Sequence, residues 1–204
     1  MKNRDYKQFA LGAVMHIYNR GNNREKIFFE DQDYKAFLFR LGLCLGFTEE
    51  ELNKEQSLAM PYSRIRITST DKNNFRLHAF CLMPNHFHLL IEQIGDIPVS
   101  KLISQVCTSY AMYINKKYTR IGHVFQERFK SVLMENNPQL MWISSYIHMN
   151  PVKAKITQHP AEYEWSSYLD FVHKRNLPIL HKDLVMSTFD EKDFEQETFE
   201  LSKD

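Results

Sequence analysis

Apolar and polar positions follow two periods along this chain, and these periods predict its strands and helices. Alternating or continuous apolar runs predict strands at 14–19, 64–68, 75–83 and 86–93, with 125–134 partly extended. Apolar residues at i, i+3 and i+4 spacing predict helices at 31–46, from about 98 to 118, and from Pro138 to the residue before Pro151, where proline should stop the helix. This order predicts an α+β domain in which helices pack on an antiparallel sheet.

The strand at 86–93 opens with a His-Phe-His triplet. Because residues i and i+2 of a strand point to the same face, His86 and His88 should project side by side, roughly 7 Å apart at about 3.3 Å per residue. Phe87 should turn to the opposite face and pack there. Two neutral imidazoles at that separation can share one divalent metal, although a pair of hydrogen-bonded histidines would show the same pattern.

The predicted helix after Pro138 carries two residues that could complete such a site. Tyr146 and Asn150 are at i and i+4, so they lie on one helix face. Asn150 offers a carbonyl oxygen, which suits Mg²⁺ or Mn²⁺, and Tyr146 offers a phenol, which is a nucleophile once deprotonated. A core tyrosine and an asparagine that ends a helix before proline remain the alternative interpretations.

Charge is unevenly distributed, although the net charge is only +1. Residues 1–100 carry 13 basic and 12 acidic side chains, residues 101–160 carry 8 and 2, and residues 161–204 carry 5 and 11. Aromatic residues interleave with the basic ones of the middle segment, which fits a polyanion such as nucleic acid, with a solvated helix face as the alternative. The acidic tail is either a separate solvated helix or a shield for the basic surface.

The composition is that of a cytoplasmic globular protein. The 204 residues contain no apolar run long enough to cross a membrane and no apolar stretch behind the N-terminus, so neither a transmembrane helix nor a signal peptide is predicted. The three cysteines, Cys44, Cys81 and Cys107, have neither the number nor the spacing of a disulfide framework or a zinc knuckle. We expect them to be reduced and packed as small hydrophobic residues.

Four segments carry a longer pattern. They are IYNRGNNR at 17–24, CLMPNHFHLL at 81–90, GHVFQERFKS at 122–131 and YIHMNPVKA at 146–154, followed by WSSY at 165–168. In order and spacing they resemble the single-tyrosine HUH transposases of the IS200/IS605 type, and most closely the REP-associated tyrosine transposases. The resemblance extends from about Val14 to Tyr168.

The resemblance implies the HUH endonuclease fold, a ferredoxin-like antiparallel sheet with packed helices and with His86 and His88 on a central strand. It implies that Asn150 joins the two histidines in binding Mg²⁺ or Mn²⁺, and that Tyr146 is the nucleophile. The preceding helix carries three rival tyrosines, of which the first two fall on its apolar stripe and are interpreted as packing residues. They are Tyr110, Tyr113 and Tyr118.

The reaction that the resemblance implies is DNA transposition: an endonuclease and strand transferase cleaves and rejoins single-stranded DNA at hairpin, or palindromic, sites through a 5′-phosphotyrosine intermediate. The protein would act as a monomer or a homodimer. Two alternatives remain, a domesticated protein that binds hairpin DNA without transposing it and a phosphodiesterase that uses a metal-bound water. The candidate DNA-binding residues are basic or base-reading side chains: Arg20, Arg24, Lys116, Lys117, Arg120, His123, Gln126, Arg128, Lys130, Lys153 and Lys155.

Two features lie outside the resemblance. Glu127 stands where the family would be expected to have a small residue, usually glycine, so a carboxylate lies beside Arg128 in a loop expected to contact DNA. Residues 169–204 are predicted to form an acidic helical extension that follows a transposase domain at 1–168.

Overall fold

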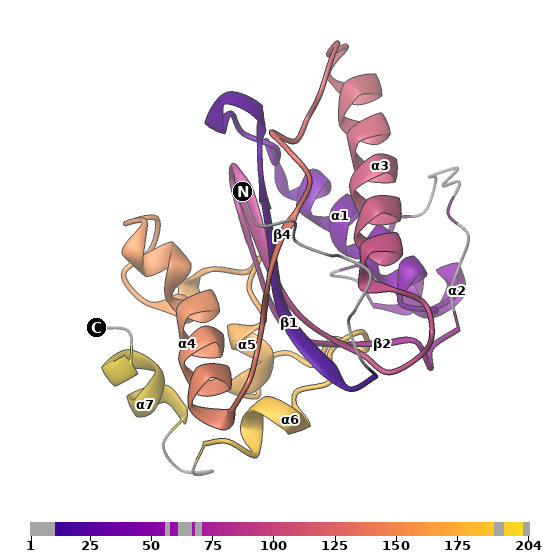
Figure 1. Ribbon diagram of the computed structural model, residues 1–204. Coiled ribbons are helices and arrows are strands. Elements are labelled where there is room, and N and C mark those ends of the chain that lie inside the picture. Colours follow the sequence, from indigo (N-terminus) through magenta and orange to yellow (C-terminus); the bar gives the residue numbers. More distant parts are fainter. Residues whose placement is uncertain (1–10, 56–57, 61–66, 68–70, 190–193, 202–204) are drawn as a thin grey trace, which may run out of the picture.

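The computed structural model describes residues 11–55, 58–60, 67, 71–189 and 194–201. Within them a four-stranded sheet carries helices on both faces (Figure 1). The strands are β1 (Ala13–Arg20), β2 (Phe75–Met83), β3 (His86–Gln93) and β4 (Lys130–Leu133). The helices are α1 (Asp31–Cys44), α2 (Glu49–Lys54), α3 (Val99–Lys117), α4 (Asn137–Lys153), α5 (Tyr168–Phe171), α6 (Asp183–Met186) and α7 (Phe194–Leu201), with short 3₁₀ turns η1 (Asn22–Arg24) and η2 (Pro160–Glu162).

The strand order across the sheet is β2-β3-β1-β4, and every neighbouring pair is antiparallel. The connections β1–α1–β2 and β3–α3–β4 each cross over one intervening strand. This arrangement confirms the predicted α+β class and the ferredoxin-like sheet. It also places β3 in the interior of the sheet, between β2 and β1, as the resemblance implied.

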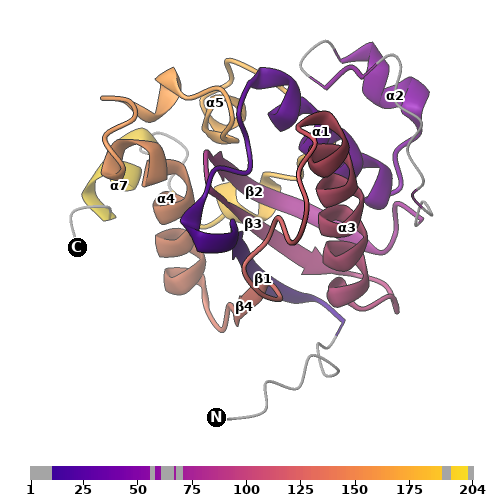
Figure 2. The same ribbon diagram turned by 90° about the horizontal axis from the view of Figure 1, so that it is seen from above.

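Alternate residues of β3 serve two different layers. Phe87 contacts Phe37 of α1, with 5.0 Å between ring centroids, whereas the His88 ring lies 5.5 Å from that of Tyr146 on α4. Figure 2 shows α1 and α3 on one side of the sheet and α4 on the other. The period-two pattern of β3 therefore separates an apolar packing face from a face that presents histidines.

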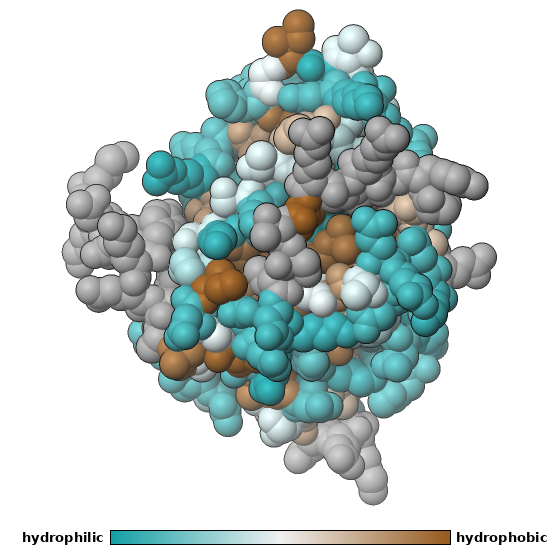
Figure 3. All heavy atoms as spheres, turned by 90° about the vertical axis from the view of Figure 1, so that its right-hand side faces the viewer, coloured by the Kyte–Doolittle hydropathy of each residue, from teal (hydrophilic) through white to brown (hydrophobic). Residues whose placement is uncertain are grey.

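The side of the molecule that carries α2 and α3 is mostly hydrophilic, with brown apolar patches between the polar side chains (Figure 3). The core lies underneath, where the apolar side of β1, β2 and β3 meets α1 and α3. All three cysteines are free thiols, as predicted; Cys44 and Cys81 are buried and Cys107 is half-buried. Within the described residues, no helix combines the length and apolar character needed to cross a membrane.

Helix α4 differs from its prediction at its C-terminal end. It does not stop before Pro151 but continues to Lys153. A proline in a helix loses its own N–H bond and crowds the carbonyl four residues earlier. Here the following turn is still closed, because the backbone N–H of Ala154 donates to the carbonyl of Asn150 at 2.9 Å. Asn150 is therefore held inside regular helix rather than at a frayed end.

Two further predictions concern segments away from the centre of the sheet. The strand predicted at 64–68 falls, apart from Ile67, outside the described residues. After Tyr168, short helices pack against α4: the Phe194 ring of α7 lies 5.8 Å from that of His148 and 5.0 Å from that of Phe171. The acidic C-terminal segment thus contributes apolar side chains to the layer that covers α4.

Candidate active site

Two histidines of β3 project toward α4, at the end of the sheet where β3 begins. His86 pairs with Arg20 of β1 and His88 pairs with Tyr18. The His86 and His88 ring centroids are 5.0 Å apart with nearly perpendicular planes, so the rings lean toward each other from the roughly 7 Å spacing of same-face strand positions. The sequence pattern therefore predicted their shared face correctly.

His86 is a neutral imidazole with one ring nitrogen oriented by a neighbour. Its Nδ1 donates to Oδ1 of Asn85 at 2.6 Å. Burial, together with the charge of Arg20, lowers the His86 pKa to about 4, against the opposing effect of a hydrogen bond with Asn150. With the proton on Nδ1, Nε2 carries the lone pair that a cation would bind.

His88 is more deeply buried and is oriented by a third histidine. Its Nδ1 lies 2.9 Å from Nε2 of His16 on β1. Burial and nearby positive charge hold the His88 pKa well below its ordinary value, and burial lowers that of His16 to about 4. Nε2 of His88 is a buried atom without a hydrogen-bond partner in the described part of the chain. A buried polar atom without a partner is uncommon in folded proteins, so this nitrogen is a candidate ligand for a cation.

Helix α4 brings Tyr146 and Asn150 to the same place. The Tyr146 ring meets the His88 ring edge-on and stacks on Trp142 with 5.4 Å between centroids. The buried Asn150 side chain donates from Nδ2 to the carbonyl of Tyr146 at 2.7 Å. Because its nitrogen is fixed to the helix backbone, Asn150 presents its amide oxygen toward His86.

These donors fit a divalent cation. Each histidine has its Nδ1 hydrogen-bonded to a neighbouring side chain, which is the usual arrangement of metal-binding histidines. Of their other nitrogens, Nε2 of His88 has no partner among the described residues, and His86 also hydrogen-bonds with Asn150. In the described residues, no three side chains drawn from His, Cys, Asp and Glu gather into a metal site. The amide oxygen of Asn150 could serve as a third donor, and nitrogen with amide oxygen suits Mn²⁺ or Mg²⁺.

Several of the predicted DNA-binding residues gather at this same end of the sheet. The carbonyl of Arg20 accepts from the backbone N–H of Gln126 at 2.9 Å, and the carbonyl of Val124 accepts from that of Asn22 at 2.9 Å. These bonds join the β1–α1 connection to the segment 122–129. The structure thereby brings together the exposed residues Arg20, Arg24, His123, Gln126 and Arg128.

Three further basic candidates flank the α4 face. Lys130 pairs with Tyr18 across β1 and β4. The Lys153 ammonium lies 5.7 Å from the centroid of the Tyr146 ring, and Lys155 is exposed just beyond α4. Of the three, Lys153 is the one whose charge lies next to the tyrosine.

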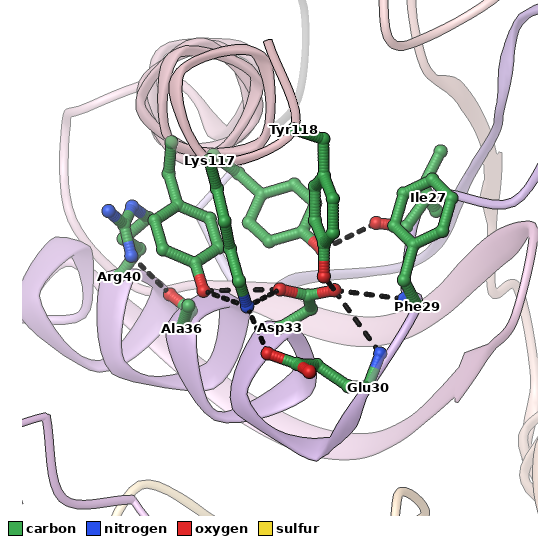
Figure 4. A network of polar contacts seen from close by, with 10 residues as sticks. Ile27, Phe29, Glu30, Asp33, Ala36, Arg40, Lys117 and Tyr118 are labelled. Atoms are coloured by element: carbon green, nitrogen blue, oxygen red, sulfur yellow. Dashed lines mark hydrogen bonds and ion pairs between the residues drawn. The ribbon is translucent and has the colours of Figure 1, made fainter. Parts of the chain in front are cut away.

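The candidates at the end of α3 lie elsewhere, on the opposite side of the sheet. Lys117 Nζ is 2.6 Å from both Glu30 and Asp33, Arg120 pairs with Glu25 at 3.0 Å, and Lys116 is exposed. Figure 4 shows the Asp33 carboxylate surrounded by donors, among them the Tyr118 hydroxyl at 2.7 Å. Of the rival tyrosines, Tyr110 is fully buried, as its packing role requires. A single sequence does not distinguish an ion-paired lysine from a free one.

Sequence reasoning missed His16. The signal was present in His16-Ile17-Tyr18-Asn19-Arg20, where every second residue is polar or aromatic and shares a face. The role of His16 could not be read from this signal, because only the pairing of β1 with β3 brings His16 beside His88.

Comparisons with known proteins show the family of this chain and a similar fold. A family model described as "Transposase IS200 like" matches residues 49–150, half of the chain and the part that contains His86, His88, Tyr146 and Asn150. A solved structure described as "Structure of the REP associates tyrosine transposase bound to a REP hairpin" is similar in fold, with a TM-score of 0.58, 15% identity and coverage of 89% of this chain and 92% of that one. A search of the curated proteins gave no match.

Proposed function

The chain belongs to the IS200-like transposase family, and from this premise we propose that it cleaves and rejoins single-stranded DNA at hairpin sites with Tyr146 as the nucleophile. One observation carries the proposal. Two neutral histidines of β3, one with an orphaned ring nitrogen, meet a tyrosine and an asparagine of α4 on one face of the sheet. The solved relative is bound to a hairpin, which supports hairpin DNA as the substrate class.

The proposed reaction transfers a phosphodiester to the tyrosine. The Tyr146 oxygen attacks the phosphorus and loses its proton, the bond to the 3′ oxygen breaks, and that oxygen takes up a proton to become a free 3′-hydroxyl. The DNA remains attached through a 5′-phosphotyrosine bond, so a second 3′-hydroxyl can reverse the step and rejoin DNA without a nucleotide cofactor. Positioning matters because a displacement of about 1 Å can cost on the order of 100-fold in rate.

His86, His88 and Asn150 are the residues that would hold Mg²⁺ or Mn²⁺. When bound, the cation supplies charge that polarises the scissile phosphate. The Lys153 ammonium lies 5.7 Å from the centroid of the Tyr146 ring, where it would contact a phosphate of the bound strand. Tyr146 and the candidate ligands lie in one cluster of one chain, which supports attack in cis, by a monomer or by each subunit of a homodimer.

Binding would combine backbone charge with contacts to unpaired bases. Arg20, Arg24 and Arg128 are the best placed for phosphates, since they gather where β3 begins, and His123 and Gln126 lie next to them. Lys130, Lys153 and Lys155 would contact the strand on the α4 side. Lys117 and Arg120 are the weakest candidates because each already has a carboxylate partner.

Replacing the nucleophile tests this proposal and produces the largest effect that we predict. Labelled single-stranded hairpins, including the palindromes nearest the gene, are incubated with protein and Mg²⁺ and run on a denaturing gel. The wild-type protein and the control Tyr113→Phe should form a covalent adduct, whereas Tyr146→Phe should form none because it lacks the attacking oxygen.

The same gel separates the alternatives. Cleavage without an adduct that persists in Tyr146→Phe would indicate a phosphodiesterase using a metal-bound water. Hairpin binding with neither cleavage nor an adduct in the wild-type protein would indicate a domesticated DNA-binding protein.

A further inference from the structure

A cavity lies between α3 and the segment 125–129, on the sheet face opposite to His86 and His88. Its volume is about 480 Å³, within the range of about 300–1,000 Å³ that is typical of small-ligand sites. Side chains from β1, α3 and the 125–129 segment form its walls. They include Asn19, Ser104, Thr108, Phe125, Glu127 and Arg128.

The α3 wall of this cavity is a stripe of hydroxyl groups. Ser100, Ser104 and Thr108 follow one another at four-residue spacing, so they line one face of the helix. Their side chains make no hydrogen bond to other residues in the described ranges, which leaves them able to donate and to accept. Phe125 provides an aromatic surface on the other side. Hydroxyls facing an aromatic ring suit a flat, polar-edged molecule such as a nucleobase.

Glu127 gives the cavity a preference for hydrogen-bond donors. A carboxylate only accepts hydrogen bonds, and Glu127 lines the cavity together with Arg128, the next residue in the chain. The backbone there is fixed, because Nδ2 of Asn19 donates to the carbonyl of Glu127 at 3.1 Å. An exocyclic amino group satisfies such an acceptor. Thymine and uracil instead present carbonyl oxygens on both sides of their N–H, which repel a carboxylate.

The cavity is within reach of a strand bound at the candidate active site. Asn19 and Arg20 are consecutive residues at the end of β1, one facing the cavity and the other paired with His86. The 125–129 segment begins beside them, where Phe125 forms a bridge with Gly21. A single strand that follows Arg20 around this end of the sheet therefore arrives at the cavity.

We propose that this cavity binds an unpaired nucleobase with an exocyclic amino group, taken from the single strand that flanks the hairpin, and that Glu127 accepts a hydrogen bond from that amine. The inference rests on the proposed function, because it requires single-stranded DNA at the site. Arg128 would bind the neighbouring phosphate and offset the negative charge of the carboxylate.

Two single strands of equal length that differ at one ring position test the proposal. Oligodeoxycytidine carries an amino group where oligodeoxyuridine carries an oxygen, and their affinities can be compared by fluorescence anisotropy. The wild-type protein should bind the cytidine strand about tenfold more tightly, which is the factor that one hydrogen bond to a charged group supplies. Glu127→Gln should bring the two affinities within about twofold, because an amide both donates and accepts.

Two controls keep this result specific. Glu135→Gln removes the same charge from an exposed site near α4 and should keep the tenfold preference. Ser104→Leu, at an exposed position on α3, should fill the cavity and lower the affinity for cytidine to that for uridine. Equal binding of both strands by the wild-type protein, or a preference that survives in Glu127→Gln, overturns the base-binding site. If adduct formation with hairpins persists in that case, the proposed function stands; if the wild-type protein neither binds these strands nor forms an adduct, both fail.

Discussion

Two buried polar clusters lie on opposite faces of the same sheet, and they differ in how completely they satisfy their own hydrogen bonds. Around Asp33, both carboxylate oxygens accept bonds, from Lys117 and Tyr113 on one side and from Tyr118 and the Phe29 backbone on the other (Figure 4). Around His88, the outer ring nitrogen has no partner in the described structure. The first cluster is complete as folded, and the second is incomplete, because one ring nitrogen has no partner in the described residues.

An orphaned nitrogen is not enough to identify a binding site, as another buried histidine shows. His148 also has a buried nitrogen, Nδ1, without a partner among the described residues. Its neighbours, however, are the rings of Tyr168, Phe171 and Phe194, so no second donor points the same way. What distinguishes the candidate active site is the convergence of several donors on one point.

Removing one of the candidate metal ligands should abolish metal binding at the incomplete cluster. In His88→Ala the cation would lose a ligand, so we expect adduct formation on hairpin DNA to fall by on the order of 100-fold or more. We also expect Mn²⁺ to raise the melting temperature of the wild-type protein and not that of the variant, which differential scanning calorimetry measures. The exposed His173→Asn should behave as the wild type, and a Mn²⁺ shift that persists in His88→Ala would place the metal elsewhere.

A substitution in the complete cluster should lower the stability of the fold and leave metal binding unchanged. Asp33→Asn keeps the shape of the side chain but removes the charge that faces Lys117, so we expect the free energy of unfolding to fall by about 2–4 kcal/mol. The partial exposure of Lys117 keeps this loss below that of a fully buried pair. Urea denaturation measures it, and the exposed Asp31→Asn in the same helix turn serves as the control. Equal losses in the two variants would mean that the network contributes nothing of its own.

His16 belongs to the incomplete cluster but would not touch the metal, and its removal should have a smaller effect. His16→Phe fills the same space but no longer accepts from Nδ1 of His88, so the imidazole loses its fixed orientation. We expect Mn²⁺ affinity to drop by about 10- to 100-fold, the usual effect of losing a group that orients a metal ligand. Isothermal titration calorimetry measures this change. His16→Gln, whose amide oxygen can accept the same bond, should recover part of the affinity, and an unchanged affinity in His16→Phe would refute the positioning role.

The sequence predicted the elements of both faces because each depends on local periodicity. The alternation in β3 and the i, i+4 pair of α4 placed His88 and Tyr146 on the correct sides. The extent of α4 was wrong, since a proline is tolerated when the backbone around it still closes its hydrogen bonds, and this depends on the residues after Pro151.

Partners from distant segments could not be predicted in the same way. Lys117 lies 84 residues after Asp33 in the sequence, and only the packing of α3 on α1 turns it from a DNA-binding candidate into an ion-paired residue. His16 acquires its role through strand pairing. The resemblance to a family supplied the link between His86, His88 and Asn150 that periodicity alone did not contain.

Lowering the pH should remove the stability that Asp33 contributes to the complete cluster. This is the smallest of the effects that we predict. Burial alone would raise the Asp33 pKa, but hydrogen bonds from Lys117, Tyr118 and the Phe29 backbone outweigh it and lower the pKa below its ordinary value. A carboxyl with a lowered pKa in the folded state contributes stability above its unfolded pKa of about 3.9 and loses it as the pH falls through the folded pKa. The difference in unfolding free energy between the wild-type protein and Asp33→Asn, measured in urea at successive pH values, should therefore be constant near neutrality and shrink below about pH 4. A difference that stays constant down to pH 2 would show that the charge of Asp33 does not stabilise the fold.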